Sequence, residues 1–204
     1  FKGEIKAKIP AWLPSDLLRE KFDLVLLAVK AYDMEEAAQQ ILPFLKKDSL
    51  VVSLQNGLCE DDLAHIVGRE RTVGCMVGFG ATLIEKGFFD MTSGGELVLG
   101  NLDGKKDQRI EEIAKLFSHI VPSYISKNIY GVLYSKLIIN SCITTLGVIS
   151  GQRLGRMLIR NKIRKIFIAI IREAMEVAAH MKIMVEPYAG KVNYYQFTGD
   201  LSWL

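Results

Sequence analysis

Short apolar runs that alternate with helical patterns restrict the fold of the first 127 residues more than any other feature of the sequence. The runs cover residues 22–29, 50–54 and 73–77. Each is nearly unbroken by polar residues, which is typical of a strand covered on both faces in a parallel sheet. Helical patterns at 34–46 and 59–67 lie between the runs. This alternation predicts an α/β domain with a largely parallel sheet.

Single residues refine the ends of these two helices. Pro43 is expected to bend or end the first helix, because proline cannot donate the backbone hydrogen bond that the helix interior needs. The second helix carries Glu60, Asp61 and Asp62 in its first turn, where negative charges interact favourably with the helix dipole.

The remainder of this half predicts a hairpin, one more helix and one more strand. Residues 92–95 (Thr-Ser-Gly-Gly) separate the stretches 87–91 and 96–99, a pattern that indicates a β-hairpin. Apolar side chains at helical spacing follow at 110–120, and residues 123–126 form a short β-like stretch.

The character of the chain changes near residue 127. Residues 130–149 and 157–183 are both long helical patterns, and residues 150–155 separate them with two glycines. We therefore expect an α/β domain at 1–127 and an all-helical domain at 128–204.

The composition suits a folded chain in a reducing compartment. Of the 204 residues, 50% are hydrophobic and 24% are charged, which argues against disorder. A net charge of +3 is too small to indicate nucleic acid binding on its own. Cys59, Cys75 and Cys142 are scattered, so no disulfide framework is expected, and the three histidines are too far apart for a local metal motif. We expect no metal site.

The most apolar stretch, residues 131–150, carries a narrow polar stripe. Lys136, Asn140 and Thr144 are spaced four residues apart and share one face of a helix. A membrane span rarely tolerates a lysine and an asparagine near its middle, so we favour a buried helix of a soluble domain. The stripe is either a solvent face or a functional face. A single lysine among apolar residues is a suitable general acid, and Asn140 could orient it or bind a substrate oxygen.

Polar residues also follow two of the predicted strands. Lys30 comes directly after the run at 22–29, and Asn56 follows the run at 50–54. Ligands of open α/β sheets bind outside the carboxyl ends of the strands, so both residues are site candidates. The alternatives are that Lys30 is an ordinary surface lysine and that Asn56 forms a simple turn with Gly57.

Two further features are weaker signals. Residues 78–81 (Gly-Phe-Gly-Ala) lack the third glycine of a dinucleotide fingerprint, and no GxGxxG occurs in the 204 residues. Basic residues cluster at 153–172 with only Phe167 as an aromatic residue among them, which favours a solvated face over a nucleic acid surface. One or two of these side chains could still reach a cofactor or a partner subunit.

Four short segments, taken in order, resemble the ketopantoate reductase (2-dehydropantoate 2-reductase) family. They are Leu-Ala-Val-Lys-Ala-Tyr at 27–32, Ser-Leu-Gln-Asn-Gly at 53–57, Gly-Phe-Gly-Ala-Thr at 78–82 and Tyr-Ser-Lys-Leu-Ile-Ile-Asn at 134–140. Their separations also match, and residues 173–178 resemble part of a late helix of the family. The resemblance implies an incomplete Rossmann-like, NADP-binding parallel-sheet domain at 1–127 and a partial helical substrate and dimerisation domain at 128–204.

By this resemblance Lys136 is the catalytic proton donor, which protonates the carbonyl oxygen as NADPH delivers hydride. Asn140 corresponds to a substrate-binding asparagine. Thr144 stands where the family often has a second substrate asparagine, and residues 153–157 (Arg-Leu-Gly-Arg-Met) depart from the family's Pro-Asn-Gly-Glu-Leu-like segment. These departures leave a related 2-keto acid open as the substrate.

The remaining candidates correspond to cofactor positions of the family. Lys30 and Asn56 match residues that contact NADP(H) at the active site, and Gly80 or Ala81 matches a backbone contact to the cofactor. The family's N-terminal strand, glycine loop and helix are absent from the 204 residues, as is a later helical segment. We therefore expect these residues alone to be inactive.

The function implied by the resemblance is NADPH-dependent reduction of 2-dehydropantoate or a similar 2-keto acid, in pantothenate and coenzyme A biosynthesis in the cytoplasm. Neither a nucleic acid nor a membrane is expected as a partner, and a homodimer through the helix at 157–183 stays open. The alternatives are a relative of the β-hydroxyacid or 6-phosphogluconate dehydrogenases, and a non-catalytic paralogue that binds a nucleotide or metabolite.

Overall fold

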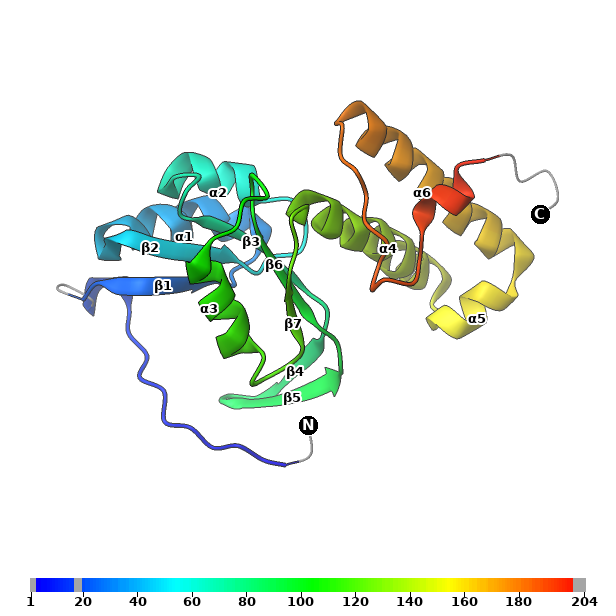
Figure 1. Ribbon diagram of the computed structural model, residues 1–204. Helices are drawn as coiled ribbons and strands as arrows, with labels where there is room; N and C mark the ends of the chain where they lie inside the picture. Colours follow the sequence, from blue (N-terminus) through cyan, green and yellow to red (C-terminus); the bar gives the residue numbers. More distant parts are fainter. Residues whose placement is uncertain (1–2, 17–19, 200–204) are drawn as a thin grey trace. The chain divides into compact units, whose positions relative to one another are not determined.

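The chain divides into two compact units, Phe1–Lys127 and Asn128–Leu204. The computed structural model describes residues 3–16 and 20–199. The first unit has a sheet with helices on both of its faces, and the second is helical (Figure 1). An α/β part followed by a helical part is the fold class that the sequence predicts.

The first unit is built around a five-stranded sheet. Its elements are η1 (Pro14–Asp16), β1 (Phe22–Leu27), η2 (Ala31–Asp33), α1 (Met34–Ile41), η3 (Leu42–Phe44), β2 (Leu45–Ser53), α2 (Glu60–Val67), β3 (Thr72–Val77), β4 (Gly80–Glu85), β5 (Phe88–Ser93), β6 (Leu97–Asn101), α3 (Gln108–Phe117) and β7 (Ser123–Ile125). The strand order is β1-β2-β3-β6-β7, and all neighbours are parallel except β3 and β6. Strands β4 and β5 form a separate antiparallel pair.

Alternate residues of β2 pack on opposite faces of this sheet. Val51 belongs to the core cluster that contains Leu63 and other residues of α1 and α2. Leu50 and Val52 belong to the cluster on the other face, which contains Phe117 of α3. Figure 1 shows α1 and α2 together on one side and α3 on the other. Burial on both faces explains why the sequence of β2 is a continuous apolar run.

Strand β2 begins earlier than the sequence suggests. Pro43 ends helix α1 as expected, because it falls within η3 and the helix stops at Ile41. The strand then starts at Leu45, and its exposed polar residues 46–48 precede the apolar run. These residues lie at a register irregularity between β1 and β2, where no alternating pattern marks them as a strand.

The predicted hairpin is wrong in its pairing. The hairpin joins β4 to β5, and its turn lies at Lys86 and Gly87, where Gly87 has a φ of +79°. Strand β6, expected as the second arm, instead pairs antiparallel with β3 in the main sheet. A Cβ atom on Gly95 would lie 2.2 Å from the carbonyl oxygen of Gly78, so the two glycines allow the chain to return beside β3.

The second unit contains α4 (Ile129–Ser150), α5 (Leu154–Ile159), α6 (Asn161–His180) and η4 (Tyr194–Phe197). The Tyr134 hydroxyl donates to the carbonyl of Ala174 at 2.9 Å, which joins α4 to α6. The Tyr194 hydroxyl donates to the carbonyl of Ser135 at 2.8 Å and fixes η4 on α4. Among the described helices, α4 alone is long and apolar enough to cross a membrane by length and composition, and 33% of its most apolar window is buried within the structure.

The single long helix predicted at 157–183 is wrong, because the chain breaks at Arg160. This residue has extended backbone angles, φ −88° and ψ 116°, and separates α5 from α6. Its carbonyl accepts the first backbone bond of α6, from Arg164 at 3.0 Å. Apolar residues continue at helical spacing on both sides of the break, since Met157 and Phe167 are both buried, so the periodicity does not reveal it.

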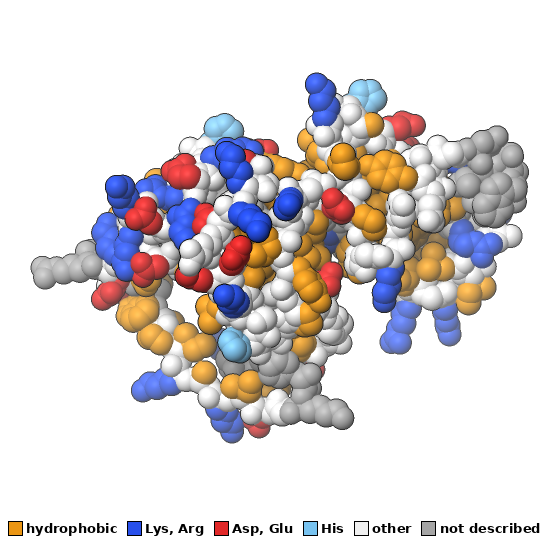
Figure 2. All heavy atoms as spheres, viewed as in Figure 1, with side chains coloured by type: hydrophobic (Ala, Val, Ile, Leu, Met, Phe, Trp, Pro, Cys, Tyr) orange, Lys and Arg blue, Asp and Glu red, His pale blue; other side chains and the backbone are white. Residues whose placement is uncertain are grey.

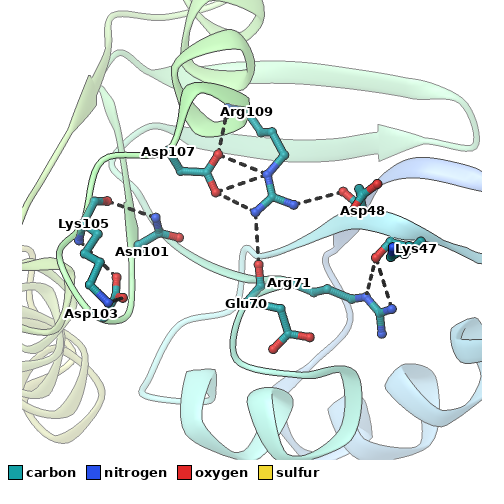
Figure 3. Close-up of polar contacts among 9 residues, drawn as sticks. All are labelled: Lys47, Asp48, Glu70, Arg71, Asn101, Asp103, Lys105, Asp107 and Arg109. Atoms are coloured by element: carbon teal, nitrogen blue, oxygen red, sulfur yellow. Dashed lines mark hydrogen bonds and ion pairs between the residues drawn. The ribbon is translucent and has the colours of Figure 1, made fainter.

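Two arginines donate hydrogen bonds to backbone carbonyls near the amino-terminal ends of the sheet strands (Figure 3). Arg109 at the start of α3 forms a bidentate pair with Asp107 and also donates to the carbonyls of Asp48 and Glu70, at 3.1 and 3.3 Å. The Arg71 side chain donates to the carbonyl of Lys47. These bonds therefore lie at the amino-terminal ends of the parallel strands β1, β2 and β3, at the opposite end from their carboxyl termini.

Candidate functional site

Lys30 and Asn56 lie beyond the carboxyl ends of the neighbouring strands β1 and β2, on the same side of the sheet. Leu27 and Ser53 are paired in the parallel register of β1 and β2, and the two candidates each come three residues after a member of that pair. The backbone amide of Leu54 donates to the carbonyl of Leu27 at 3.0 Å, which extends the pairing past the strand ends. Both side chains are exposed. A ligand at the carboxyl edge of the sheet can therefore reach them.

Lys30 has a defined backbone position at this edge. It precedes η2, and its carbonyl accepts a hydrogen bond from the amide of Asp33 at 2.9 Å. The bond fixes the turn that leads from β1 into α1. The exposed ammonium group suits an anionic part of a ligand.

The loop after β2 leaves room for a ligand against its backbone. Asn56 is followed by Gly57, which has a φ of +110°. A Cβ atom at Gly57 would meet nothing within 4 Å, so space is open beside it. Within this loop Asn56 is exposed and Gly57 and Leu58 are half-buried, while Gln55 before them and Cys59 after them are buried.

A buried polar cluster underlies the same loop. It consists of Ser53, Gln55 and Glu60, which are 0%, 7% and 1% exposed. The Ser53 hydroxyl donates to Gln55 Oε1 at 2.8 Å. Neither carboxyl oxygen of Glu60 nor the side-chain amide nitrogen of Gln55 has a hydrogen-bond partner among the described residues. Burial raises the pKa of Glu60, and the nearby Ser53 hydroxyl offsets this only in part.

The sequence does not predict this cluster, because Glu60 stands beside Asp61 and Asp62 in the first helical turn, where acidic residues are expected to be exposed. The structure exposes Asp61 and Asp62 but buries Glu60. The spacing of Glu60, Leu63 and Val67 places all three on one helical face, and all three are buried. That spacing is the signal that could have identified Glu60 as a buried acid.

Gly80 and Ala81 open strand β4, directly after the carboxyl end of β3. Gly80 is half-buried and pairs with Ser93, whereas Ala81 is exposed. A Cβ atom on Gly80 would lie 2.6 Å from the Ser93 hydroxyl oxygen, a side-chain atom that can move. The stricter demand for glycine is at Gly78, where a Cβ atom would lie 2.8 Å from the backbone oxygen of Glu96.

In the second unit, Lys136 and Asn140 occupy one face of α4. Both are half-buried. Ile138 and Cys142 are fully buried and are offset from them by two residues, or about 200° around the helix. The polar stripe is therefore opposite the side of α4 that packs in the unit's core, where Cys142 Sγ lies 3.6 Å from the carbonyl of Phe167.

Thr144 differs from the other two residues of the stripe. It is exposed, and its hydroxyl donates to the carbonyl of Asn140 at 2.7 Å. A hydroxyl bonded to the preceding helical turn has no proton left to donate to a ligand. In this conformation Thr144 can offer a substrate only an acceptor.

The basic cluster expected to be a solvated face is largely exposed. Lysine and arginine side chains project from the surface over α5 and the start of α6 (Figure 2). Arg172 is the exception, since it is half-buried and donates to the carbonyls of Phe197 and Gly199 at 2.8 and 2.6 Å. Arg172 thereby holds η4 to α6, and it is structural.

Each unit thus carries a different part of the chemistry. The first unit presents an ammonium, an amide and open backbone at the carboxyl edge of a parallel sheet, which suits a nucleotide ligand. The second presents a half-buried lysine and asparagine one turn apart, which suits proton donation to an oxygen and a hydrogen bond to the same molecule.

Two family models together match most of the chain. One is described as ketopantoate reductase PanE/ApbA and matches residues 2–104. The other is described as ketopantoate reductase PanE/ApbA C terminal and matches residues 128–197. The matches cover the α/β unit and the helical unit separately, and the order of the two parts is the same.

Curated relatives agree with these matches. The chain is 27% identical over 165 residues to the 2-dehydropantoate 2-reductase of Aquifex aeolicus, which covers 79% of this chain and 53% of the relative. It is 25% identical over 179 residues to that of Pyrococcus horikoshii, with 87% and 59% covered. The chain therefore spans little more than half of these relatives' length.

Solved structures show the same fold. D-mandelate dehydrogenase in complex with NADH and anilino(oxo)acetate superposes with a TM-score of 0.82 at 25% identity, over 96% of this chain and 62% of that one. A PanE/ApbA family ketopantoate reductase from Ralstonia eutropha gives a TM-score of 0.73 at 27% identity, over 85% and 56%. The α/β unit is accordingly Rossmann-like.

Proposed function

This chain belongs to the ketopantoate reductase family, and on that premise we propose that the intact protein reduces 2-dehydropantoate, or a similar 2-keto acid, to the 2-hydroxy acid with NADPH. The observation that carries the proposal is the match of both units to that family. The half-buried Lys136 and Asn140 on α4 supply the acid and amide groups that this reaction needs.

Reduction of a keto group adds a hydride to the carbonyl carbon and a proton to the carbonyl oxygen. NADPH, when bound, supplies the hydride. We assign the proton to Lys136, whose Nζ donates to the oxygen as the carbon–oxygen π bond breaks. Asn140 is one helical turn away and binds the substrate through a hydrogen bond. Thr144 lies a further turn along and accepts rather than donates, because its proton is used within the helix.

The residues of the α/β unit fit the cofactor. Asn56 is exposed beside the open backbone of Gly57, and Lys30 lies beyond the same sheet edge. The proposal assigns Lys30 and Asn56 to side-chain contacts with the cofactor and Gly80 or Ala81 to a backbone contact. These assignments make residues 1–127 a cofactor domain and residues 128–204 a domain for substrate binding and dimerisation.

The likeness to D-mandelate dehydrogenase favours a second candidate within the same chemistry. That protein is bound to NADH and acts on a 2-hydroxy acid with an aromatic substituent. Thr144, which stands where the family often has a second substrate asparagine, lies on the helix that carries the proposed substrate-binding residues. A bulkier 2-keto acid, and NADH as the reductant, are therefore the alternatives to test against 2-dehydropantoate and NADPH.

A place in pantothenate and coenzyme A biosynthesis follows if 2-dehydropantoate is the substrate, and with it a cytoplasmic location. A homodimer belongs to the same proposal, since a ketopantoate reductase from Staphylococcus aureus is described as dimeric. No nucleic acid or membrane enters the proposed reaction.

The test is a matrix of steady-state assays on the intact protein. Each of NADPH and NADH is combined with 2-dehydropantoate and with the 2-keto acid that corresponds to mandelate. The proposal predicts the highest kcat/KM for NADPH with 2-dehydropantoate. Preference for the aromatic acid would support the second candidate. Binding of a cofactor without turnover of either acid would indicate a non-catalytic paralogue or a dehydrogenase with another class of substrate.

A further inference from the structure

The first turn of α4 is held from outside the helix by the segment that follows α6. Asn128 directly precedes α4, and its side-chain Oδ1 accepts a hydrogen bond from the amide of Gly131 at 3.1 Å. Its Nδ2 donates to the carbonyl of Met184 at 2.7 Å and to Glu186 Oε1 at 2.8 Å. One side chain therefore caps α4 and also joins it to residues 56 and 58 positions later in the chain.

The chemistry of its partners fixes the orientation of this amide group. The Gly131 amide can only donate and the Met184 carbonyl can only accept, so the side-chain oxygen of Asn128 faces the first and its nitrogen faces the second. Asparagine carries one acceptor oxygen and two donor hydrogens, and the three bonds use all of them. Aspartate and serine, which are also common at this position of a helix, supply the acceptor but not the two donors.

Backbone contacts reinforce the same junction. The amide of Glu186 donates to the carbonyl of Gly131 at 3.2 Å. A Cβ atom on Gly131 would lie 2.1 Å from the carbonyl oxygen of Met184, so glycine is what lets the two backbones approach this closely. Val185, between the two bonded residues, is buried. The segment at 184–186 is thus packed directly on α4.

A second tether lies one turn further along α4. The Tyr194 hydroxyl donates to the carbonyl of Ser135, the residue directly before Lys136, at 2.8 Å. Tyr194 is among the most deeply buried large side chains of the described residues. The two tethers are themselves joined, because the amide of Val185 donates to the Tyr195 hydroxyl at 3.2 Å. Together they form one connected support for the first two turns of α4.

The tethered residues share one face of α4, and Lys136 and Asn140 lie on another. Residues 128, 131 and 135 are spaced three and four apart, which is the spacing of a single helical face. Lys136 is offset from Ser135 by about 100° around the helix, and Asn140 is one turn after Lys136. The support therefore fixes the rotation of α4 about its own axis from a face other than the polar stripe.

We propose that Asn128 is a positioning residue for the proposed reduction. By joining the start of α4 to the segment at 184–186, it sets the rotation of α4 and with it the directions of Lys136 and Asn140. The positioning concerns α4 alone, and only its effect on turnover rests on the proposed function. A proton donor and a substrate-binding amide on one helix turn together, so a change in this junction affects both.

Asn128→Asp is the central variant of the intact protein. It keeps the acceptor for the Gly131 amide, removes both donors and places a carboxylate beside Glu186. Combining it with Glu186→Gln reverses the polarity of the side-chain bond, because the new amide can donate to the new carboxylate. Asn128→Ser is the second variant, since it keeps a cap without adding a charge.

Ala169→Gly is the matched control. Ala169 is exposed in the middle of α6, where glycine lowers the stability of a helix without touching any of these bonds. For every protein we measure the melting temperature, kcat, the KM of the 2-keto acid, the dissociation constant of NADPH and the backbone amide resonances of Lys136 and Asn140.

In both Asn128 variants we expect kcat to fall about 10- to 100-fold and the KM of the 2-keto acid to rise, since small misplacements of reacting groups have costs of this size. The amide resonances of Lys136 and Asn140 should shift. The dissociation constant of NADPH should stay within about twofold of wild type, because its proposed contacts lie in the first unit. Adding Glu186→Gln to Asn128→Asp should restore kcat and the resonances in part, since the Met184 carbonyl still lacks its donor.

Two results would overturn the positioning role. One is a wild-type kcat with unshifted Lys136 and Asn140 resonances in Asn128→Asp or, if that variant does not fold, in Asn128→Ser. The other is an equal loss of kcat in Ala169→Gly, which would assign the effect to stability alone. Resonances that shift in the Asn128 variants and return in the double variant would support the role even if the intact protein reduces no keto acid, and the proposed function alone would then be wrong.

Discussion

Leu27 and Ser53 are paired in register where the parallel strands β1 and β2 end. The exposed Lys30 and Asn56 each follow a member of this pair by three residues, so both lie beyond the carboxyl ends of these strands. Open α/β sheets bind their ligands at the carboxyl ends of the strands. The proposed cofactor contacts of Lys30 and Asn56 rest on this relationship together with the family match of the first unit.

Replacement of Asn56 by alanine should weaken cofactor binding without unfolding the protein. The side chain is exposed, so the melting temperature should stay close to that of wild type. Loss of one hydrogen bond to the ligand should raise the dissociation constant about tenfold. Titration calorimetry with NADPH measures this, with the exposed Gln39→Ala on α1 as the control. Unchanged affinity would remove Asn56 from the site.

Gly95→Ala should destabilise the first unit strongly. The added Cβ atom would lie 2.2 Å from the carbonyl oxygen of Gly78, so the backbone between β3 and β6 must move. We expect a loss of about 1–3 kcal/mol in the free energy of unfolding. Gly94→Ala is the matched control, because a Cβ atom there meets nothing within 4 Å. Equal stability of the two variants in urea denaturation would contradict the close approach.

Arg109→Ala should also lower stability, and its effect should depend on pH. The Arg109 guanidinium holds the pKa of Asp107 below its usual value through their hydrogen bonds. A lowered folded-state pKa stabilises the protein above the unfolded pKa, and this contribution is lost as the pH falls through the folded value. Because the Arg109 side chain is 41% exposed, we expect only about 1–2 kcal/mol at neutral pH.

Denaturation of wild type and Arg109→Ala at about pH 7 and about pH 3 measures this difference. The gap between the two proteins should shrink at the acid pH as Asp107 is protonated. Lys106→Ala, an exposed cation beside the same loop, is the control and should have little effect at either pH. A gap of the same size at both pH values would mean that the Asp107 charge does not contribute.

Glu60→Gln should stabilise the protein at neutral pH, which is the opposite of the usual effect of a core substitution. Burial raises the pKa of Glu60 from an ordinary value of 4.5, so the folded protein binds a proton that the unfolded chain releases. Wild-type stability therefore falls as the pH rises above 4.5 toward the folded pKa, by about 1.4 kcal/mol for each unit of the shift.

Thermal melts from about pH 4 to about pH 8 should show the two proteins converging at the acid end, with Glu60→Gln melting higher at the neutral end. Asp62→Asn is the control, because it removes an exposed carboxylate from the same helical turn and should change the melting temperature little. A Glu60→Gln variant that melts below wild type at pH 8 would show that the ionised carboxylate has a stabilising partner.

The sequence was sufficient for features whose signals are local. The apolar runs of β1, β2 and β3 and the helical spacing in α3 and α4 identified the α/β unit and the helical unit. The Rossmann-like fold and the family were recognised from four short segments, and the comparisons confirmed both. Lys136, Asn140 and the cofactor residues stay predictions.

The sequence did not predict features that depend on contacts between residues far apart in the chain. The pairing of β6 with β3 depends on the approach of Gly95 to Gly78, which no local pattern encodes. The break at Arg160 interrupts an apolar spacing that continues on both sides. The burial of Glu60 was readable from its spacing with Leu63, but its acidic neighbours suggested a solvated turn.

The most direct test of the central claim is the kcat of Lys136→Ala in the intact protein, at saturating NADPH and 2-keto acid, with the cofactor dissociation constant measured in parallel. Loss of the proton donor should lower kcat by about 10²–10⁴-fold and leave cofactor affinity unchanged. Lys165→Ala, an exposed lysine of α6, should turn over like wild type. A Lys136→Ala variant with wild-type kcat would contradict the assignment of Lys136 as the proton donor.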